Sequence, residues 1–159
     1  MSRESRFEAA LDRVLALVVF LNDDMTRALA RDGLTASRAH LIWELVQRGP
    51  STQRVLADAM RVSARTVTGL IDGLVETGFV TREKHPSDRR AALVTLTAHG
   101  QGVAERLQRE QRTFSRDLFA GMPRAEFDGF VAGLDYVMTR LRELSIRHAA
   151  ASGTGDGDV

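Results

Sequence analysis

Apolar residues recur at helical spacing along residues 5–31, the first long segment of the chain. They occupy the a and d positions of a heptad pattern, and the stripe consists of Phe7, Leu11, Val14, Val18, Leu21, Met25 and Ala28. Further apolar residues lie off this stripe, so a single packing partner would not cover the helix. We therefore expect it to be buried in an interface between two subunits. The alternative is a central core helix of a monomer.

Two helical segments near the other end of the chain show the same kind of pattern. Thr97 is placed to cap the first of them. The second carries another heptad-like stripe and runs to about residue 147; this stripe consists of Phe127, Phe130, Leu134, Val137, Leu141 and Leu144. Residues 148–159 are mostly small or polar, and we expect them to be disordered. The first helix and these two are predicted to form a helical dimerisation domain.

The segment between these helices begins with two shorter helical patterns. Thr35 can cap a helix that contains Trp43 and ends at Gly49-Pro50. Ser51 or Thr52 can then start a short helix that reaches Met60. A tight break follows at residues 61–62.

A third helix of this middle segment is predicted from Ser63 to Thr77, and it is the second helix of a pair whose first member is the helix that reaches Met60. Its apolar stripe is spaced for burial on one face and consists of Val67, Leu70, Ile71 and Leu74. Gly78 can take the left-handed conformation that ends a helix. Two strand-like runs, residues 79–84 and 91–96, then flank a turn that contains Pro86. Helix, turn, helix and hairpin, in this order, are typical of a winged helix-turn-helix.

The exposed side of the second helix carries side chains suited to DNA. Ser63 is a good N-cap residue, and Arg65, Thr66 and Thr68 in the first turns are the types that contact base edges and phosphates. Further basic residues lie in the hairpin. The candidate DNA contacts are therefore Ser63, Arg65, Thr66, Thr68, Arg82, Asp88, Arg89 and Arg90.

The chain resembles the MarR (multiple antibiotic resistance regulator) family over nearly all of residues 5–147. The resemblance rests on the run from Ser63 to Gly78, on the Leu34-Thr35 opening before Trp43, and on two motifs that are specific in combination. These are an Asp-x-Arg wing, Asp88-Arg89-Arg90 after Arg82, and a Leu-Thr-x-x-Gly run, Leu96-Thr97-Ala98-His99-Gly100.

The resemblance implies a dimeric transcriptional regulator, often a repressor, whose DNA affinity responds to a phenolic or other lipophilic ligand. It also implies that Asp88 orients Arg90 toward a minor groove. In the family, effectors often bind between the dimerisation helices and the winged unit. There Arg38, His40 and Trp43 are candidates for an aromatic acid. The alternative is that Trp43 is a core residue and His40 a satisfied interface residue.

Three residues depart from the family pattern. Gly69 and Gly73 replace long, often basic side chains on the second helix, so each is expected to remove a phosphate contact. Each also costs roughly 1 kcal/mol of helix propensity relative to alanine. Arg61 occupies a turn where glycine is common, which predicts either a strained turn or a different one.

Composition and charge limit the kinds of function that the chain can have. The net charge is only +1, and residues 51–97 hold seven Lys and Arg against five Asp and Glu, so the position of the cations matters more than their sum. There is no cysteine, which excludes disulfides and thiol chemistry. The four histidines are scattered, and no catalytic or phosphate-binding motif occurs. We expect no enzyme activity, no cofactor and no metal. No apolar run could span a membrane and no signal peptide is apparent, so a cytoplasmic location is expected.

The sequence thus predicts a mostly α protein with a small β-hairpin wing. The expected organisation is a dimerisation helix (1–34), a winged helix-turn-helix DNA-binding domain (35–97), two further dimerisation helices (98–147) and a tail (148–159). The expected function is a homodimeric, sequence-specific regulator of double-stranded DNA, a repressor relieved by a small lipophilic or aromatic ligand at a palindromic operator. The alternative is a winged-helix module for protein contacts without DNA binding. The two differ in salt dependence, because only phosphate contacts release counterions.

Overall fold

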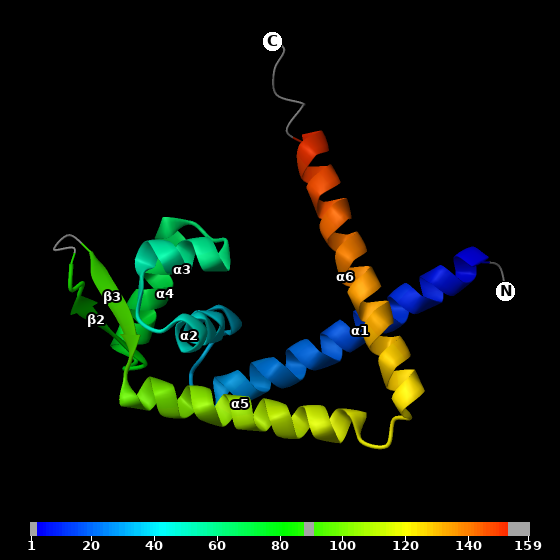
Figure 1. The fold of residues 1–159 in the computed structure, drawn as a ribbon, viewed down its shortest axis with the longest axis horizontal. Coiled ribbons are helices and arrows are strands. Elements are labelled where there is room, and N and C mark those ends of the chain that lie inside the picture. Colours follow the sequence, from blue (N-terminus) through cyan, green and yellow to red (C-terminus); the bar gives the residue numbers. More distant parts are fainter. Residues whose placement is uncertain (1–2, 88–90, 153–159) are drawn as a thin grey trace, which may run out of the picture. The chain divides into compact units, whose positions relative to one another are not determined.

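A computed structural model describes residues 3–87 and 91–152, and it divides the chain into two compact units, Met1–Arg109 and Glu110–Val159. The elements, in order, are α1 (Arg3–Ala30), α2 (Ala36–Arg48), β1 (Ser51–Thr52), α3 (Gln53–Met60), α4 (Ala64–Glu76), β2 (Val80–Lys84), β3 (Ala92–Leu96), α5 (Ala98–Phe119) and α6 (Arg124–Ser152) (Figure 1). The mostly helical fold with a small antiparallel sheet confirms the predicted fold class.

The helix starts follow the predicted caps. The side chains of Thr35, Thr52 and Ser63 accept hydrogen bonds from backbone N–H groups in the first turns of α2, α3 and α4. Thr97 does the same for α5, where its Oγ1 accepts from the N–H of Gly100 at 3.0 Å. These bonds satisfy donors that a helix start otherwise leaves unpaired.

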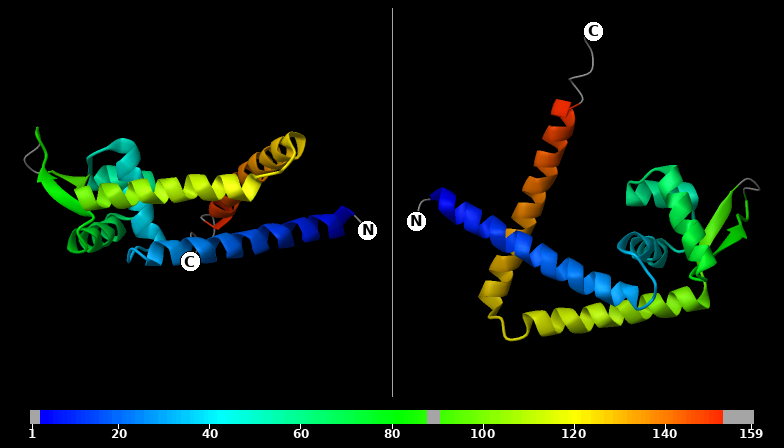
Figure 2. Two further views of the ribbon diagram at one scale, coloured as in Figure 1. Left: turned by 90° about the horizontal axis from the view of Figure 1, so that it is seen from below. Right: turned by 180° about the vertical axis from the view of Figure 1, so that it is seen from behind.

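The sheet has one strand more than the predicted hairpin. Its order is β1-β3-β2, and β2 pairs with β3 in antiparallel register, with Val80 opposite Leu96. The two strands lie side by side in each view (Figure 2). β1 adds Ser51 opposite Val94 on the other side of β3. A two-residue strand has no period that a sequence can reveal, and for that reason it was not predicted.

The core of the first unit lies between α2, α3, α4 and the sheet. Its fully buried side chains include those of Leu41, Leu56, Val67, Ile71, Leu74 and Val94. Three of the four residues of the predicted α4 stripe are fully buried, and Leu70 packs against the same cluster. One face of α4 is thereby fixed against the core, which leaves the other face available at the surface.

The start of α5 is fastened to the start of β2. The carbonyl oxygen of Phe79 accepts hydrogen bonds from the backbone N–H of Thr97 at 3.0 Å and from its hydroxyl at 3.2 Å. Gly100 is buried against the same carbonyl, and a Cβ at this position would overlap the oxygen. The Leu-Thr-x-x-Gly run of the sequence therefore has a local steric reason.

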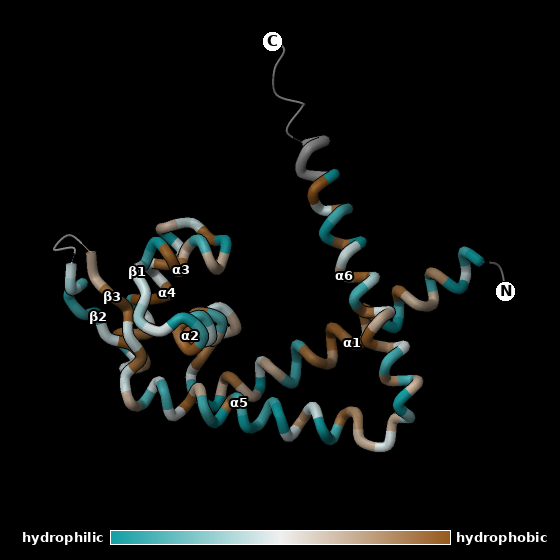
Figure 3. Tube along the Cα trace, in the orientation of Figure 1, coloured by the Kyte–Doolittle hydropathy of each residue, from teal (hydrophilic) through white to brown (hydrophobic). Residues whose placement is uncertain are grey.

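Large apolar side chains of α1 stay exposed within the single chain. Those of Phe7, Leu11, Val18, Phe20 and Met25 are among them, and apolar residues recur along the whole helix (Figure 3). Leu29, at the helix end, is the buried residue of α1.

In the second unit, the ring of Phe119 packs edge-on against that of Phe127, with centroids 5.3 Å apart. Beyond this contact, α6 exposes Leu134, Val137 and Leu141. α6 runs to Ser152, several residues past the predicted end near residue 147. The rest of the predicted tail, residues 153–159, lies outside the described residues.

Candidate nucleic-acid interface

The exposed face of α4 begins with the predicted contact residues. Ser63 precedes the helix, and its Oγ accepts from the N–H of Thr66 at 3.1 Å and lies 2.8 Å from the Thr66 hydroxyl. The Arg65 side chain is exposed in the first turn, and within the described residues it has no hydrogen bond or ion pair. The guanidinium of Arg65 is thus available to an external partner.

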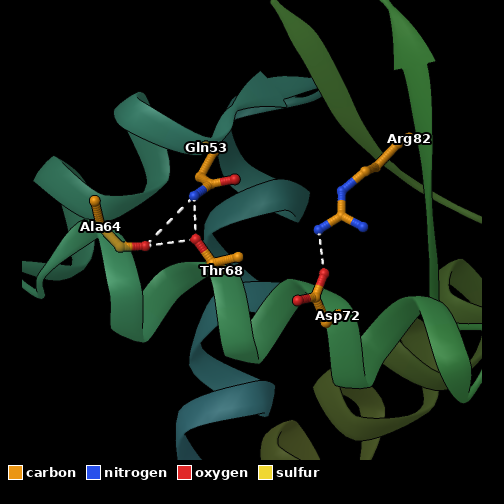
Figure 4. Close-up of polar contacts among 5 residues, drawn as sticks. All are labelled: Gln53, Ala64, Thr68, Asp72 and Arg82. Carbon is orange, nitrogen blue, oxygen red and sulfur yellow. Dashed lines mark hydrogen bonds and ion pairs between the residues drawn. The ribbon is translucent and has the colours of Figure 1, made fainter.

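The hydroxyl of Thr68 takes part in two hydrogen bonds within the protein. It donates to the carbonyl oxygen of Ala64 at 2.7 Å and accepts from the side-chain amide of Gln53, the first residue of α3 (Figure 4). The same amide lies 3.4 Å from the Ala64 oxygen. Gln53 therefore connects the two helices of the helix-turn-helix. The sequence did not single out Gln53, because nothing in a helical pattern tells which surface amide meets the next helix.

Arg82, on the first strand of the wing, points back to α4. Its Nη2 lies 2.5 Å from Oδ1 of Asp72, and both side chains are partly exposed (Figure 4). This ion pair joins the wing to the middle of α4. Arg82 is predicted from the sequence as a DNA contact, whereas the sequence gives Asp72 no role.

The tip of the wing carries the three remaining candidates. Asp88, Arg89 and Arg90 lie outside the described residues. On either side of them the hairpin is closed by a bond from the N–H of His85 to the carbonyl oxygen of Ala91, at 3.2 Å. Their roles stay predictions from the sequence.

The two unusual glycines of α4 differ from each other. Gly69 is exposed, and nothing lies within 4 Å of the place where a Cβ would stand. Gly73 is buried, and a Cβ there would overlap the guanidinium of Arg38 from α2. The expectation that Gly73 removes a phosphate contact was therefore wrong, because a side chain at this position would point at Arg38 and not outward.

Arg61 closes the turn between α3 and α4 in the left-handed conformation, with φ 54° and ψ 43°. Its backbone N–H donates to the carbonyl oxygen of Asp58 at 3.2 Å. A side chain in this region is strained relative to glycine. Of the two alternatives that the sequence left open for this turn, the structure has the strained one.

The candidate ligand residues lie on α2. Arg38 is partly buried against Gly73, whereas His40 is exposed and Trp43 is 39% exposed. Trp43 is thus not a fully buried core residue of the single chain. Next to them, Glu44 accepts a hydrogen bond from Arg48 Nε at 2.6 Å and lies 3.5 Å from His40 Nε2. The bond from Arg48 lowers the pKa of the Glu44 carboxyl, with a smaller contribution from His40.

Residues 3–87 and 91–152 contain no cluster of three His, Cys, Asp or Glu side chains able to hold a metal ion. None of the described helices has the length and apolar character needed to cross a membrane.

Helices α2, α3 and α4 are followed by the antiparallel hairpin of β2 and β3. Helices α3 and α4 form a helix-turn-helix whose second helix is exposed on one side, so the fold is that of a winged helix-turn-helix protein. Comparison with known proteins narrows the class. Residues 34–92 match the model of the MarR family. The chain is 26% identical over 110 residues to the uncharacterized HTH-type transcriptional regulator Mb0904 of Mycobacterium bovis, an alignment that covers 69% of this chain and 77% of that protein.

A shorter alignment and a solved structure agree with this match. The chain is 42% identical over 50 residues to the HTH-type transcriptional repressor YetL of Bacillus subtilis, which is 31% of this chain and 30% of YetL. The crystal structure of Streptococcus pneumoniae FabT in complex with DNA has the same fold, with a TM-score of 0.73 and 20% identity over 89% of this chain and 99% of FabT. The winged helix-turn-helix part of the chain therefore matches the MarR family, which the sequence motifs predicted, and the relatives of known sequence are HTH-type transcriptional regulators. These proteins are not enzymes.

Proposed function

We propose that this regulator binds double-stranded DNA through α4 and the wing, and that it represses transcription from the bound site. One observation carries the proposal: the first turn of α4 exposes Arg65 and Thr66 while the opposite face of the helix is fixed in the core. Such a helix can enter a major groove without losing its own packing. The DNA complex of FabT and the name of the repressor YetL support the same function.

The DNA-contacting residues proposed are those of the sequence analysis: Ser63, Arg65, Thr66, Thr68, Arg82, Asp88, Arg89 and Arg90. Arg65 and Thr66 contact base edges or phosphates in the major groove. Arg90 enters the flanking minor groove, where negative potential is concentrated, and Asp88 directs it through a carboxylate–guanidinium pair. Thr68, besides its proposed DNA contact, accepts a hydrogen bond from Gln53, and this bond orients α4 against α3.

The active form proposed is a homodimer. The exposed apolar residues of α1 and α6 support it, because water-exposed stripes of this length are costly in a monomer. Residues 1–34 and 98–147 would provide the dimer contacts and residues 35–97 the DNA contacts. A two-fold dimer requires a palindromic operator with half-sites about one helical turn, roughly 10 bp, apart. A cytoplasmic location belongs to the same proposal.

A small aromatic or lipophilic acid is proposed to relieve repression by binding near Arg38, His40 and Trp43. Trp43 is the single tryptophan of the chain, so its fluorescence reports on binding there. An effector must change this fluorescence and weaken DNA binding reciprocally. A compound that quenches Trp43 and leaves DNA affinity unchanged is not an effector.

The test of DNA binding is the selection of duplexes from a random pool by the purified full-length chain, at two salt concentrations. We expect an imperfect palindrome to be enriched, with affinity that falls steeply as salt rises because phosphate contacts release counterions. If no duplex is enriched and no salt-dependent binding occurs, the proposal is wrong. The winged helix would then be a module for protein contacts.

A further inference from the structure

Asp72 is an acidic residue on the face of α4 that the proposed function turns toward DNA. Its side chain is 58% exposed. An isolated carboxylate there would repel phosphate, so its presence needs a physical reason. The structure supplies one in Arg82, which reaches Asp72 from strand β2, ten residues further along the chain (Figure 4).

The Asp72–Arg82 pair engages one nitrogen of the Arg82 guanidinium and leaves the other N–H donors for a ligand. The contact to Asp72 is made by Nη2, which is one of three guanidinium nitrogens, and a guanidinium offers five N–H donors. The Arg82 side chain is 38% exposed, so donors remain accessible to a ligand. A carboxylate that holds one edge of a planar guanidinium fixes the direction of the others.

The surface beside the pair is bare. Gly69 lies one helical turn before Asp72 on α4, and outside the surrounding helix backbone nothing lies within 4 Å of the position that a Cβ would take. Residues three apart on a helix are neighbours on the same face. A DNA strand can therefore approach the α4 backbone at Gly69 more closely than it could approach a helix with a long side chain there.

We propose that Asp72 is a positioning residue that aims Arg82 at a DNA phosphate beside the open surface at Gly69. The proposal rests on the proposed function. It adds the acidic residue Asp72, whose negative charge strengthens binding to DNA although DNA is itself negatively charged. Arg82 makes the phosphate contact and Asp72 acts through it. The phosphate contact is independent of sequence, so it can be measured on a duplex of random sequence.

The structural alternative is that the pair only attaches the wing to α4. Replacing Asp72 would then lower thermal stability, and DNA binding would change only as far as the fold is lost. The salt dependence separates the two explanations, because each phosphate contact contributes about 0.9 to the slope of log affinity against log salt. A wing that is merely looser does not remove one contact selectively.

The experiment uses the full chain and a random-sequence duplex of fixed length, titrated at several KCl concentrations. Asp72→Asn keeps the shape of the side chain and removes its charge. We expect affinity at low salt to fall about five- to tenfold and the salt slope to become shallower by about one. Thermal unfolding of the variant, measured alongside, should show a folded protein.

Glu76→Gln is the matched control. Glu76 is exposed on the same helix, four residues after Asp72, and it has no ion pair within the described residues. The charge change is the same in both variants. We expect Glu76→Gln to bind as tightly as the wild type or more tightly, because an unpaired anion has been removed. If Asp72→Asn also tightens binding, Asp72 only repels DNA and the proposal is overturned.

A double-mutant cycle tests whether Asp72 acts through Arg82. In an Arg82→Ala background, Asp72→Asn should no longer weaken binding, because no guanidinium is left to aim. The same loss in both backgrounds overturns the proposal. Arg82→Lys keeps the charge and loses the planar guanidinium, so this variant should bind DNA nearly as weakly as Arg82→Ala. Wild-type affinity in Arg82→Lys would overturn the positioning role of Asp72. This test holds even if Asp72→Asn proves poorly folded.

Failure of this inference is distinct from failure of the proposed function. If the wild-type chain shows no salt-dependent duplex binding, the proposed function itself is wrong. If the wild type binds with a steep slope and Asp72→Asn behaves as Glu76→Gln does, only the role of Asp72 is wrong.

Discussion

Two glycines of α5 show how much a single residue depends on its immediate neighbours. Gly100 is packed against the carbonyl oxygen of Phe79, whereas a Cβ at Gly102 would meet no heavy atom within 4 Å. Both lie in regular helix. The same substitution should therefore have opposite effects at the two positions.

Gly100→Ala should destabilise the fold by about 1–3 kcal/mol, because a backbone carbonyl cannot move aside as a flexible side chain can. Gly102→Ala, the control, should stabilise it by about 0.5–1 kcal/mol through helix propensity. Urea denaturation of the two variants measures both free energies of unfolding. Equal effects would mean that α5 shifts away from Phe79 without cost.

Arg65 is the residue for which direct readout of a base is expected. Because its guanidinium is exposed and unpaired in the described part of the chain, Arg65→Ala should leave the fold unchanged. It should cost about 1–3 kcal/mol on the selected operator if the guanidinium binds a guanine. Titration of the selected duplex and of a random duplex measures this. A loss of equal size on both duplexes would make Arg65 a phosphate contact.

At the scale of elements, sequence patterns with a local cause were sufficient to predict where helices begin and which side of α4 is buried. The starts of α2 and α4 follow from Thr35 and Ser63, whose hydroxyls bond to backbone N–H groups three residues on. The buried side of α4 follows from its helical period. Such signals lie within one or two turns of chain, so the sequence carries them directly.

Contacts between elements could not be predicted in this way. Gln53 and Thr68 are fifteen residues apart, and Arg82 and Asp72 are ten apart. Many exposed polar residues occur on α3, α4 and β2, and the pairs that meet depend on how the helices and the hairpin pack. The burial of Gly73 was missed for the same reason, since Arg38 comes from another helix.

The wing is the element with the sharpest prediction from sequence alone. Arg90→Ala should weaken DNA binding at least about tenfold and flatten the salt slope by about one unit, with folding and dimerisation intact. Asp88→Ala should also weaken binding although it removes a negative charge, because Arg90 loses its direction. Salt titrations of both variants measure this. Tighter binding by Asp88→Ala would show that charge alone decides.

At the scale of the whole molecule, the exposed apolar residues of α1 predict self-association. Leu11 is 58% exposed in the single chain. Leu11→Glu should shift the protein from dimer to monomer in light scattering at micromolar concentration, because a buried carboxylate without a partner is costly. DNA affinity should fall with it. Arg13→Glu, which places the same side chain on an exposed polar position, is the control and should stay dimeric.

The joint between Phe79, Thr97 and Gly100 has a mechanical consequence. Two hydrogen bonds and one close backbone contact lock the first turn of α5 to the base of β2. Because of these contacts, the first turn of α5 and the start of the hairpin are expected to move together. The joint thus fixes the direction in which the hairpin leaves the first turn of α5.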